Sequence, residues 1–109
     1  RDWNSDVCSS DLFLQTMVDI KEGDGTLLDN MLIVVDTDHG NARLHAMENI
    51  PMFTAGRAGG KVKTGLHIDG KGGQITRMAY TSMKVLGLDI NSWGTKSNQA
   101  SKEISEMLV

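Results

Sequence analysis

The distribution of apolar and polar residues along the chain predicts two short strands separated by a polar loop. Residues 31–35 are all apolar, and three of the five are β-branched. A run of this length and composition is typical of a strand buried on both faces, as in a parallel sheet with helices on either side. Residues 50–55 predict a second strand, with Pro51 near its start, where a strand tolerates proline. We therefore expect an α/β fold.

Apolar positions at helical spacing predict a helix over residues 74–86, with Gly87 as its C-terminal cap. The positions that carry this prediction are Ile75, Met78, Ala79, Met83 and Leu86. The other expected elements are, in chain order, the end of a helix over 13–20, a turn over 22–25, one helical turn over 26–30, a short edge ribbon over 61–64 and 66–68, a glycine-rich loop over 70–73, a loop over 88–94 anchored by Ile90 and Trp93, and a last helix over 97–109 capped at Ser101.

The polar loop after the first strand carries the candidate chemistry. Asp38 and His39 are adjacent and His45 follows six residues later, while Asp36 directly ends the strand. Ligands in open α/β sheets lie at the carboxyl ends of strands, and carboxylate and imidazole groups bind Zn, Mn or Fe. Gly40 lets the backbone turn closely around an ion. The alternative is a solvated turn with an exposed histidine.

Composition narrows the classes of partner. The 109 residues carry a net charge of -3, which gives no signal for nucleic acid or a membrane surface. The apolar runs are far shorter than the roughly 20 residues that cross a bilayer. The size fits one small domain or a piece of one.

Residues 1–12 differ from the rest of the chain. Over residues 2–12 they resemble the translation of a short-read sequencing adapter, with a departure only at Asn4. We interpret residues 1–12 as not native. The alternative is a genuine polar tail, which is expected to be disordered. Cys8, the single cysteine, lies in this segment, so the remaining chain has no thiol for a disulfide, a nucleophile or a zinc site.

A longer pattern around the histidines resembles the C-terminal metal segment of the alkaline phosphatase superfamily. The residues that carry it are Asp38, His39, Gly40, His45 and the run from Asn49 through Ile50, Pro51, Met52, Phe53, Thr54 and Ala55 to Gly56. In that superfamily an Asp-His pair after a core strand binds one metal, and a later histidine before a Pro-containing strand binds the other. The resemblance implies that Asp38, His39 and His45 are metal ligands, with Asp36 a weaker candidate behind them.

Residues 13–93 are also similar to the C-terminal part of the HXXSHH-motif proteins, an exported domain-of-unknown-function family related to the sulfatase-like group. The similarity rests, in order, on Glu22 to Asn30, Gly40, Asn41, His45, Asn49 to Pro51, Ala55, Gly56, Gly59, Gly60, Lys63 to Gly65 and His67. It implies that residues 13–109 are a C-terminal fragment of one alkaline phosphatase-like three-layer α/β/α domain. Family members often carry a second histidine where this chain has Met47, and Asp38-His39 follows the phosphatase and sulfatase pattern more closely.

The resemblance implies a parent protein that is a metal-dependent hydrolase of phosphate or sulfate esters, with a divalent metal such as Zn, Mn or Ca. Its partners would be a small anionic ester and the remaining N-terminal part of the same domain, and its location periplasmic or extracellular. The fragment alone is expected to be inactive. The alternative is a non-catalytic exported binding or surface protein of the same fold, which Met47 favours and Asp38-His39 disfavours.

Other candidate residues favour structural roles. We expect the His67 side chain to be hydrogen-bonded to backbone groups rather than to line the site. We expect Arg57 to be a solvated charge rather than to bind an anion. Residues 56–60 lack the Gly-Lys-Ser/Thr ending of a phosphate loop and predict a tight turn. Ser82 has no acid or histidine beside it in the sequence, so it is not expected to be a nucleophile.

Overall fold

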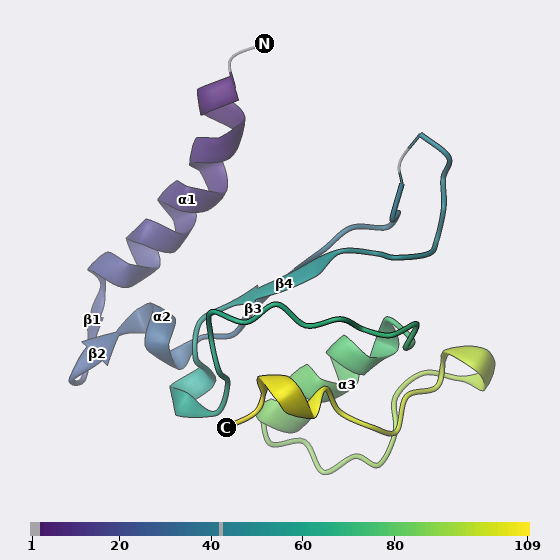
Figure 1. Cartoon of the computed structure of the whole chain (residues 1–109). Coiled ribbons are helices and arrows are strands. Elements are labelled where there is room, and N and C mark those ends of the chain that lie inside the picture. The colour runs from purple at the N-terminus through teal and green to yellow at the C-terminus, as the bar shows by residue number, and fades with distance from the viewer. Residues whose placement is uncertain (1–2, 42) are drawn as a thin grey trace.

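The computed structural model describes residues 3–41 and 43–109, and within the first helix the side chains from Ser9 onward. Of the segment 1–12, residues 1 and 2 and the side chain of Cys8 thus lie outside the described residues. The fold is a small mixed α/β structure with three α-helices and two two-stranded antiparallel sheets in the described part of the chain (Figure 1). The elements are α1 (Trp3–Asp19), β1 (Lys21–Glu22), β2 (Gly25–Thr26), α2 (Leu27–Asn30), β3 (Ile33–Asp36), β4 (Met52–Ala55), the 3-10 turn η1 (Ala58–Gly60), α3 (Thr76–Val85), and the 3-10 turns η2 (Lys96–Asn98) and η3 (Ser105–Met107).

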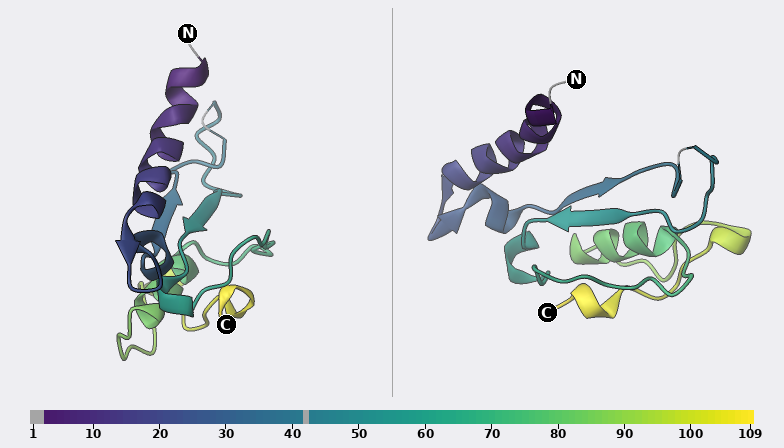
Figure 2. Two further views of the ribbon diagram at one scale, coloured as in Figure 1. Left: turned by 90° about the vertical axis from the view of Figure 1, so that its left-hand side faces the viewer. Right: turned by 45° about the horizontal axis from the view of Figure 1, so that its top comes forward.

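Helix α1 corrects the expectation of disorder for residues 3–12. The helix begins at Trp3 and continues without a break through Asp19. Residues 3–12 contain neither glycine nor proline, so a helix formed over 13–19 extends toward the N-terminus one hydrogen bond at a time. The helix projects away from the rest of the chain (Figures 1 and 2), and its apolar side chains Leu12 and Phe13 are exposed.

The predicted turn over 22–25 and the helical turn after it are both confirmed. Strands β1 and β2 pair around Gly23, whose φ of 60° is readily adopted by glycine. Helix α2 begins with a capping box, in which the Asp29 carboxylate accepts from the Thr26 backbone N–H (2.9 Å) and hydroxyl (3.1 Å). These two hydrogen bonds lower the pKa of Asp29, and the one from the Thr26 backbone has the larger effect. The positive charge of Arg57 lowers this pKa further.

The two predicted strands exist, but their pairing differs from the parallel sheet expected. Strands β3 and β4 pair antiparallel, with Val34 opposite Thr54 and Val35 opposite Phe53. Val34 is 41% exposed, Val35 37% and Phe53 52%, so the strand is not buried on both faces. An apolar, β-branched run specifies a strand, but its neighbours are set by contacts distant in sequence, which the run does not encode.

Helix α3 confirms the predicted helix over 74–86 and its cap. The Gly87 N–H donates to the Lys84 carbonyl and the Leu88 N–H to the Met83 carbonyl, which is a Schellman motif with Gly87 at φ 89°. The buried face is partly different from the one expected. Tyr80 and Thr81 are buried, whereas the predicted core residues Ile75 and Leu86 are exposed and the predicted Met78 is half-buried.

The core lies where α3 meets two segments that are distant in sequence. Val62, Val85 and Met107 form the buried cluster. Partly buried apolar side chains surround it: Leu32, Ala58, Ile68, Met78, Ile104 and Leu108. Val62 pairs with Leu108 in an isolated antiparallel bridge, so the C-terminal segment returns to the middle of the chain.

This return overturns two predicted elements. The edge ribbon expected over 61–68 does not form, because Val62 pairs with Leu108 instead. The helix expected over 97–109 is replaced by η2, a bridge between Trp93 and Ala100, and η3. Ala100 is buried while Trp93 is 47% exposed, so Trp93 holds its loop by backbone pairing and only partly by burial.

The molecule is flat and extended for its length. Its Cα radius of gyration is 15.6 Å, against about 13 Å for a compact domain of this size. Projection of α1 and of the loop between β3 and β4 accounts for the difference (Figures 1 and 2). Among the described residues, none of the helices combines the length and the hydrophobicity that a membrane span requires.

Candidate functional site

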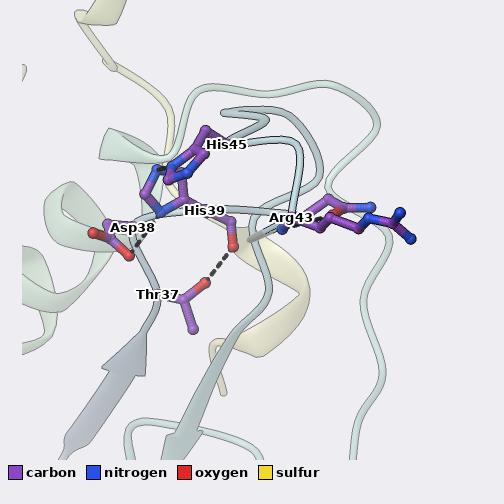
Figure 3. Close-up of polar contacts among 6 residues, drawn as sticks. Thr37, Asp38, His39, Arg43 and His45 are labelled. Carbon is purple, nitrogen blue, oxygen red and sulfur yellow. Dashed lines mark hydrogen bonds and ion pairs between the residues drawn. The ribbon is translucent and has the colours of Figure 1, made fainter.

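Residues 37–41 and 43–49, in the loop between β3 and β4, include the residues singled out in the sequence; we refer to these residues as the histidine loop. The Gly40 N–H donates to the Ala46 carbonyl (2.8 Å), and the Ala46 N–H donates to the Asn41 carbonyl (3.1 Å). The Asn41 side chain accepts from the Arg43 N–H at 3.1 Å, which is an Asx turn. These bonds fold the loop back on itself, so that His39 and His45 meet across it (Figure 3).

Asp38, His39 and His45 form a chain of polar contacts. The Asp38 Oδ1 lies 3.1 Å from Nδ1 of His39, and Nε2 of His39 lies 3.3 Å from Nδ1 of His45 (Figure 3). The two imidazole rings meet edge to face, with centroids 4.9 Å apart and planes at 82°. The Thr37 hydroxyl donates to the His39 carbonyl at 2.8 Å and holds the backbone beneath the ring.

Close backbone packing fixes the loop. A Cβ on Gly40 would overlap the carbonyl oxygen of Glu48, so only glycine fits there without a shift of the loop. His45 and Asn49 both adopt positive φ, 50° and 52° respectively. A non-glycine residue in this region costs about 1–2 kcal/mol, so the remainder of the loop must compensate for holding His45 there.

The site lies on the surface and not in a cleft. The Asp38 side chain is 92% exposed and that of His39 is 30% exposed, and His45 is exposed as well. An ion bound here would therefore keep contact with water or with donors from other segments. High exposure also means that the loop contributes little buried apolar area to stability.

The donor set fits a metal ion in part. Two nitrogen ligands about 2.0–2.1 Å from a tetrahedral zinc ion lie about 3.3 Å from each other. The observed separation between His39 Nε2 and His45 Nδ1 is 3.3 Å, which equally suits an N–H···N hydrogen bond. Among the side chains described, those of residues 9–41 and 43–109, no three His, Cys, Asp or Glu side chains surround a common point suited to an ion. Two imidazole nitrogens are thus an incomplete ligand set.

The weaker candidate Asp36 lies apart from this chain of contacts. It ends β3, opposite Met52, and its side chain is exposed. The contacts of His39 and His45 are made by each other and by Asp38, so the structure does not bring Asp36 into the set.

The remaining sequence candidates have other surroundings. His67 is exposed and lines a concavity of about 530 Å³ formed by β4, residues 63–70, α3 and the C-terminal segment. None of Asp38, His39 and His45 lines that concavity. The charge of Arg57 contributes to lowering the pKa of Asp29, and Arg57 itself is exposed, as expected of a solvated charge.

The predicted tight turn over 56–60 is confirmed. It forms η1, closed by a bond from the Gly60 N–H to the Arg57 carbonyl (2.9 Å). Ser82 donates its hydroxyl to the Met78 carbonyl one helical turn back (2.8 Å), a structural contact inside α3.

Two residues shape the site in ways that the sequence analysis did not predict. Thr37 holds the His39 carbonyl, and Asn41 closes the loop through its side chain and backbone. The turn at Asn41 could have been predicted, because Gly-Asn between polar residues is typical of a turn. The contact of Thr37 could not have been predicted, because a hydroxyl between two carboxylates in the sequence indicates no particular hydrogen-bond acceptor.

Comparisons of the chain with protein families, with curated proteins and with solved structures gave no match. The likeness to the alkaline phosphatase superfamily and to the HXXSHH-motif proteins therefore stays a prediction from the sequence.

Proposed function

We propose that this chain is the C-terminal part of an alkaline phosphatase-like three-layer domain and supplies part of its metal centre. The parent protein is then a metal-dependent hydrolase of phosphate or sulfate esters, exported to the periplasm or the cell exterior. The observation that carries the proposal is the contact chain from Asp38 through His39 to His45. A divalent metal bound there would act as a Lewis acid and stabilise charge on the transferred group.

The position of the histidine loop supports the proposal. The loop directly follows β3, as the Asp-His pair of the resembled superfamily follows a core strand. The exposed side chains of Val34, Val35 and Phe53 also support it, because in a three-layer domain further strands and helices cover such a strand pair.

The chain by itself is expected to be inactive. Two imidazole nitrogens leave at least two positions of a tetrahedral ion to other donors. A hydrolase of this kind also needs a nucleophile, and the one serine weighed for that role, Ser82, is hydrogen-bonded within α3. The rest of the centre would have to come from the N-terminal part of the same domain.

A second function, a non-catalytic exported binding or surface protein of the same fold, is favoured by Met47. This residue stands where the resembled family often carries a further histidine, and its side chain is 75% exposed. A thioether does not replace imidazole for a borderline or hard ion. With Met47 in that position, the protein would have fewer metal ligands than catalysis requires.

Metal analysis and ester hydrolysis on the intact parent protein separate the two functions. We expect one to two equivalents of metal in the wild type, less in His39→Ala, and unchanged content in the matched control His67→Ala. Metal-dependent hydrolysis of aryl phosphate or aryl sulfate supports the hydrolase. Metal content equal in the wild type and His39→Ala would reject the metal centre, and bound metal without hydrolysis would favour the binding protein.

A further inference from the structure

The concavity beside β4 that His67 lines is separate from the histidine loop. Its volume is about 530 Å³, and small-molecule sites in proteins measure roughly 300–1,000 Å³. Its walls come from β4, residues 63–70, the first turn of α3 and the C-terminal segment. Because Asp38, His39 and His45 do not line it, a ligand bound there would not depend on the proposed metal centre.

Apolar side chains from several segments line this concavity. Those that are half-buried or buried are Ile50, Met52, Ile68, Met78, Ile104 and Met107. Three of the six are methionines, whose flexible and polarisable side chains adapt to irregular apolar shapes. The removal of such surface from water favours binding of an apolar group. The lining therefore suits a flexible alkyl chain.

Arg77 is the half-buried charge in the lining. The other charged lining residues, Lys63, Asp69 and Glu106, are exposed, so water and salt screen their charges. Among the side chains that the structure describes, no carboxylate forms an ion pair with the Arg77 guanidinium. A charge that is partly removed from water is stabilised most by an opposite charge. The concavity therefore favours an anionic ligand over a cationic one.

The contacts of Arg77 leave one edge of its guanidinium free. Nε donates to the Lys102 carbonyl (3.4 Å) and Nη2 donates to the Glu103 carbonyl (3.1 Å). These two neutral acceptors occupy the edge that Nε and Nη2 share. One N–H on each terminal nitrogen remains on the outer edge, and two parallel N–H groups match the two oxygens of a carboxylate.

We propose that this concavity binds an alkyl carboxylate, such as a medium-chain fatty acid. The carboxylate accepts two hydrogen bonds from the outer edge of Arg77, and the alkyl chain lies against the half-buried side chains of Met52, Ile68 and Met78. This site goes beyond the proposed hydrolase function and does not rest on it.

The absence of a side chain at Gly73 leaves room for the guanidinium. A Cβ on Gly73 would lie 2.9 Å from Nη1 and 3.1 Å from Cδ of Arg77, so alanine there displaces the end of the Arg77 side chain. Gly70 also lines the concavity, and a Cβ on Gly70 would have no atom within 4 Å. Gly73→Ala and Gly70→Ala are therefore a matched pair, of which only the first moves the guanidinium.

Methyl NMR of the methionines in the full 109-residue chain tests the proposal, with sodium decanoate as the ligand at concentrations below micelle formation. We expect saturable shifts at Met52 and Met78, with a dissociation constant on the order of 0.1–1 mM. Met17 and Met83 do not line the concavity and should not shift. The absence of decanoate shifts at millimolar concentration would overturn the proposal.

Two further ligands test the two parts of the proposed chemistry. Decyltrimethylammonium carries the same alkyl chain on a cation, and acetate carries the carboxylate without the chain. Neither should saturate the methionine shifts at concentrations where decanoate does. Equal binding of the cation would contradict the role of charge, and equal binding of acetate would contradict the role of the alkyl chain.

Variants of the lining identify the residue that holds the carboxylate. Arg77→Met should weaken decanoate binding about 10–100-fold, whereas Lys63→Met, which removes an exposed charge, should change it less than about threefold. Because Arg77→Met also loses two contacts to the C-terminal segment, Gly73→Ala gives a second test that keeps the charge. It should bind decanoate several-fold more weakly than Gly70→Ala. Equal losses in the first pair, or equal affinities in the second, would overturn the role of Arg77.

Discussion

The two halves of the chain differ in where they place their apolar side chains. In residues 56–109, Val62, Val85 and Met107 are 1%, 6% and 3% exposed and pack into one cluster. In residues 3–55, Val35 and Phe53 remain 37% and 52% exposed, and α1 stands clear of the core. Residues 56–109 contain the buried core that stabilises the structure, and residues 3–55 contain the candidate functional residues.

This difference has a physical consequence for mutations. Stability follows buried apolar area and satisfied buried polar groups, which lie mainly in the C-terminal half. In the proposed metal centre, metal affinity would depend on the imidazole rings of His39 and His45 and on the loop that aligns them. Changes in one region should therefore leave the property carried by the other region nearly unaffected.

The largest expected effect on stability comes from Met107→Ala. This substitution opens a cavity in the buried cluster and should lower the free energy of unfolding by about 2–5 kcal/mol. Met47→Ala removes the same atoms from a side chain that is 75% exposed, so it should change stability by less than about 0.5 kcal/mol. Urea unfolding followed by circular dichroism measures both. Similar losses in the two variants would break the proposed division between the halves.

Gly56→Ala tests the junction between the two regions. Gly56 is buried with φ at 96°, and a Cβ there would overlap the carbonyl oxygen of Met31. We expect a loss of about 1–3 kcal/mol from overpacking in addition to the cost of the positive φ. Gly65→Ala, at φ 75° with no neighbouring atom within 4 Å, measures the φ cost alone. Equal unfolding midpoints for the two variants would show that the junction is loosely packed.

Thr81→Val removes a hydroxyl from the buried face of α3. The Thr81 hydroxyl donates to the Arg77 carbonyl and accepts from the Ile104 N–H (2.9 Å), which ties the C-terminal segment to the helix. The buried N–H would lose its acceptor, at a cost of about 1–3 kcal/mol. Ser82→Ala is the matched control, because its hydroxyl bonds only within the helix. Hydrogen exchange of the Ile104 amide should accelerate in the first variant and not in the second.

The smallest effect is expected from Asp29→Asn and depends on pH. The pKa of Asp29 is lowered in the folded chain, so its ionised form stabilises the fold. That contribution is present above the ordinary aspartate pKa of 3.8 and is lost as the pH falls through the lower folded value. The stability difference between wild type and variant should therefore shrink below pH 3.8. A stability difference that stays constant across this pH range would contradict the expectation.

Local elements were predictable from the sequence because local interactions decide them. Gly87 ends α3 through its own backbone bonds, and the Thr26–Asp29 capping box starts α2 within four residues. The pairing of Val62 with Leu108 was not predictable, because no residue near either one specifies the other. The same holds for the antiparallel pairing of β3 and β4.

The sequence identified the candidate site residues but not the contacts among them. Asp38, His39 and His45 were identified from residue type and spacing, and the structure brings them into contact. Which ring nitrogen faces which partner depends on the fold of the loop, including the Asn41 turn and the close approach of Gly40 to Glu48. Whether the three residues bind a metal stays a prediction.

The most direct test of this division is the unfolding free energy with and without zinc, for the wild type and for the double variant His39→Ala/His45→Ala. Without zinc, we expect the two proteins to agree within about 0.5 kcal/mol, because both rings lie in an exposed loop. With zinc at about 100 times its dissociation constant, the wild type should gain about 2.7 kcal/mol and the variant nothing. An equal gain in both proteins, or a variant that is much less stable without zinc, would contradict the account.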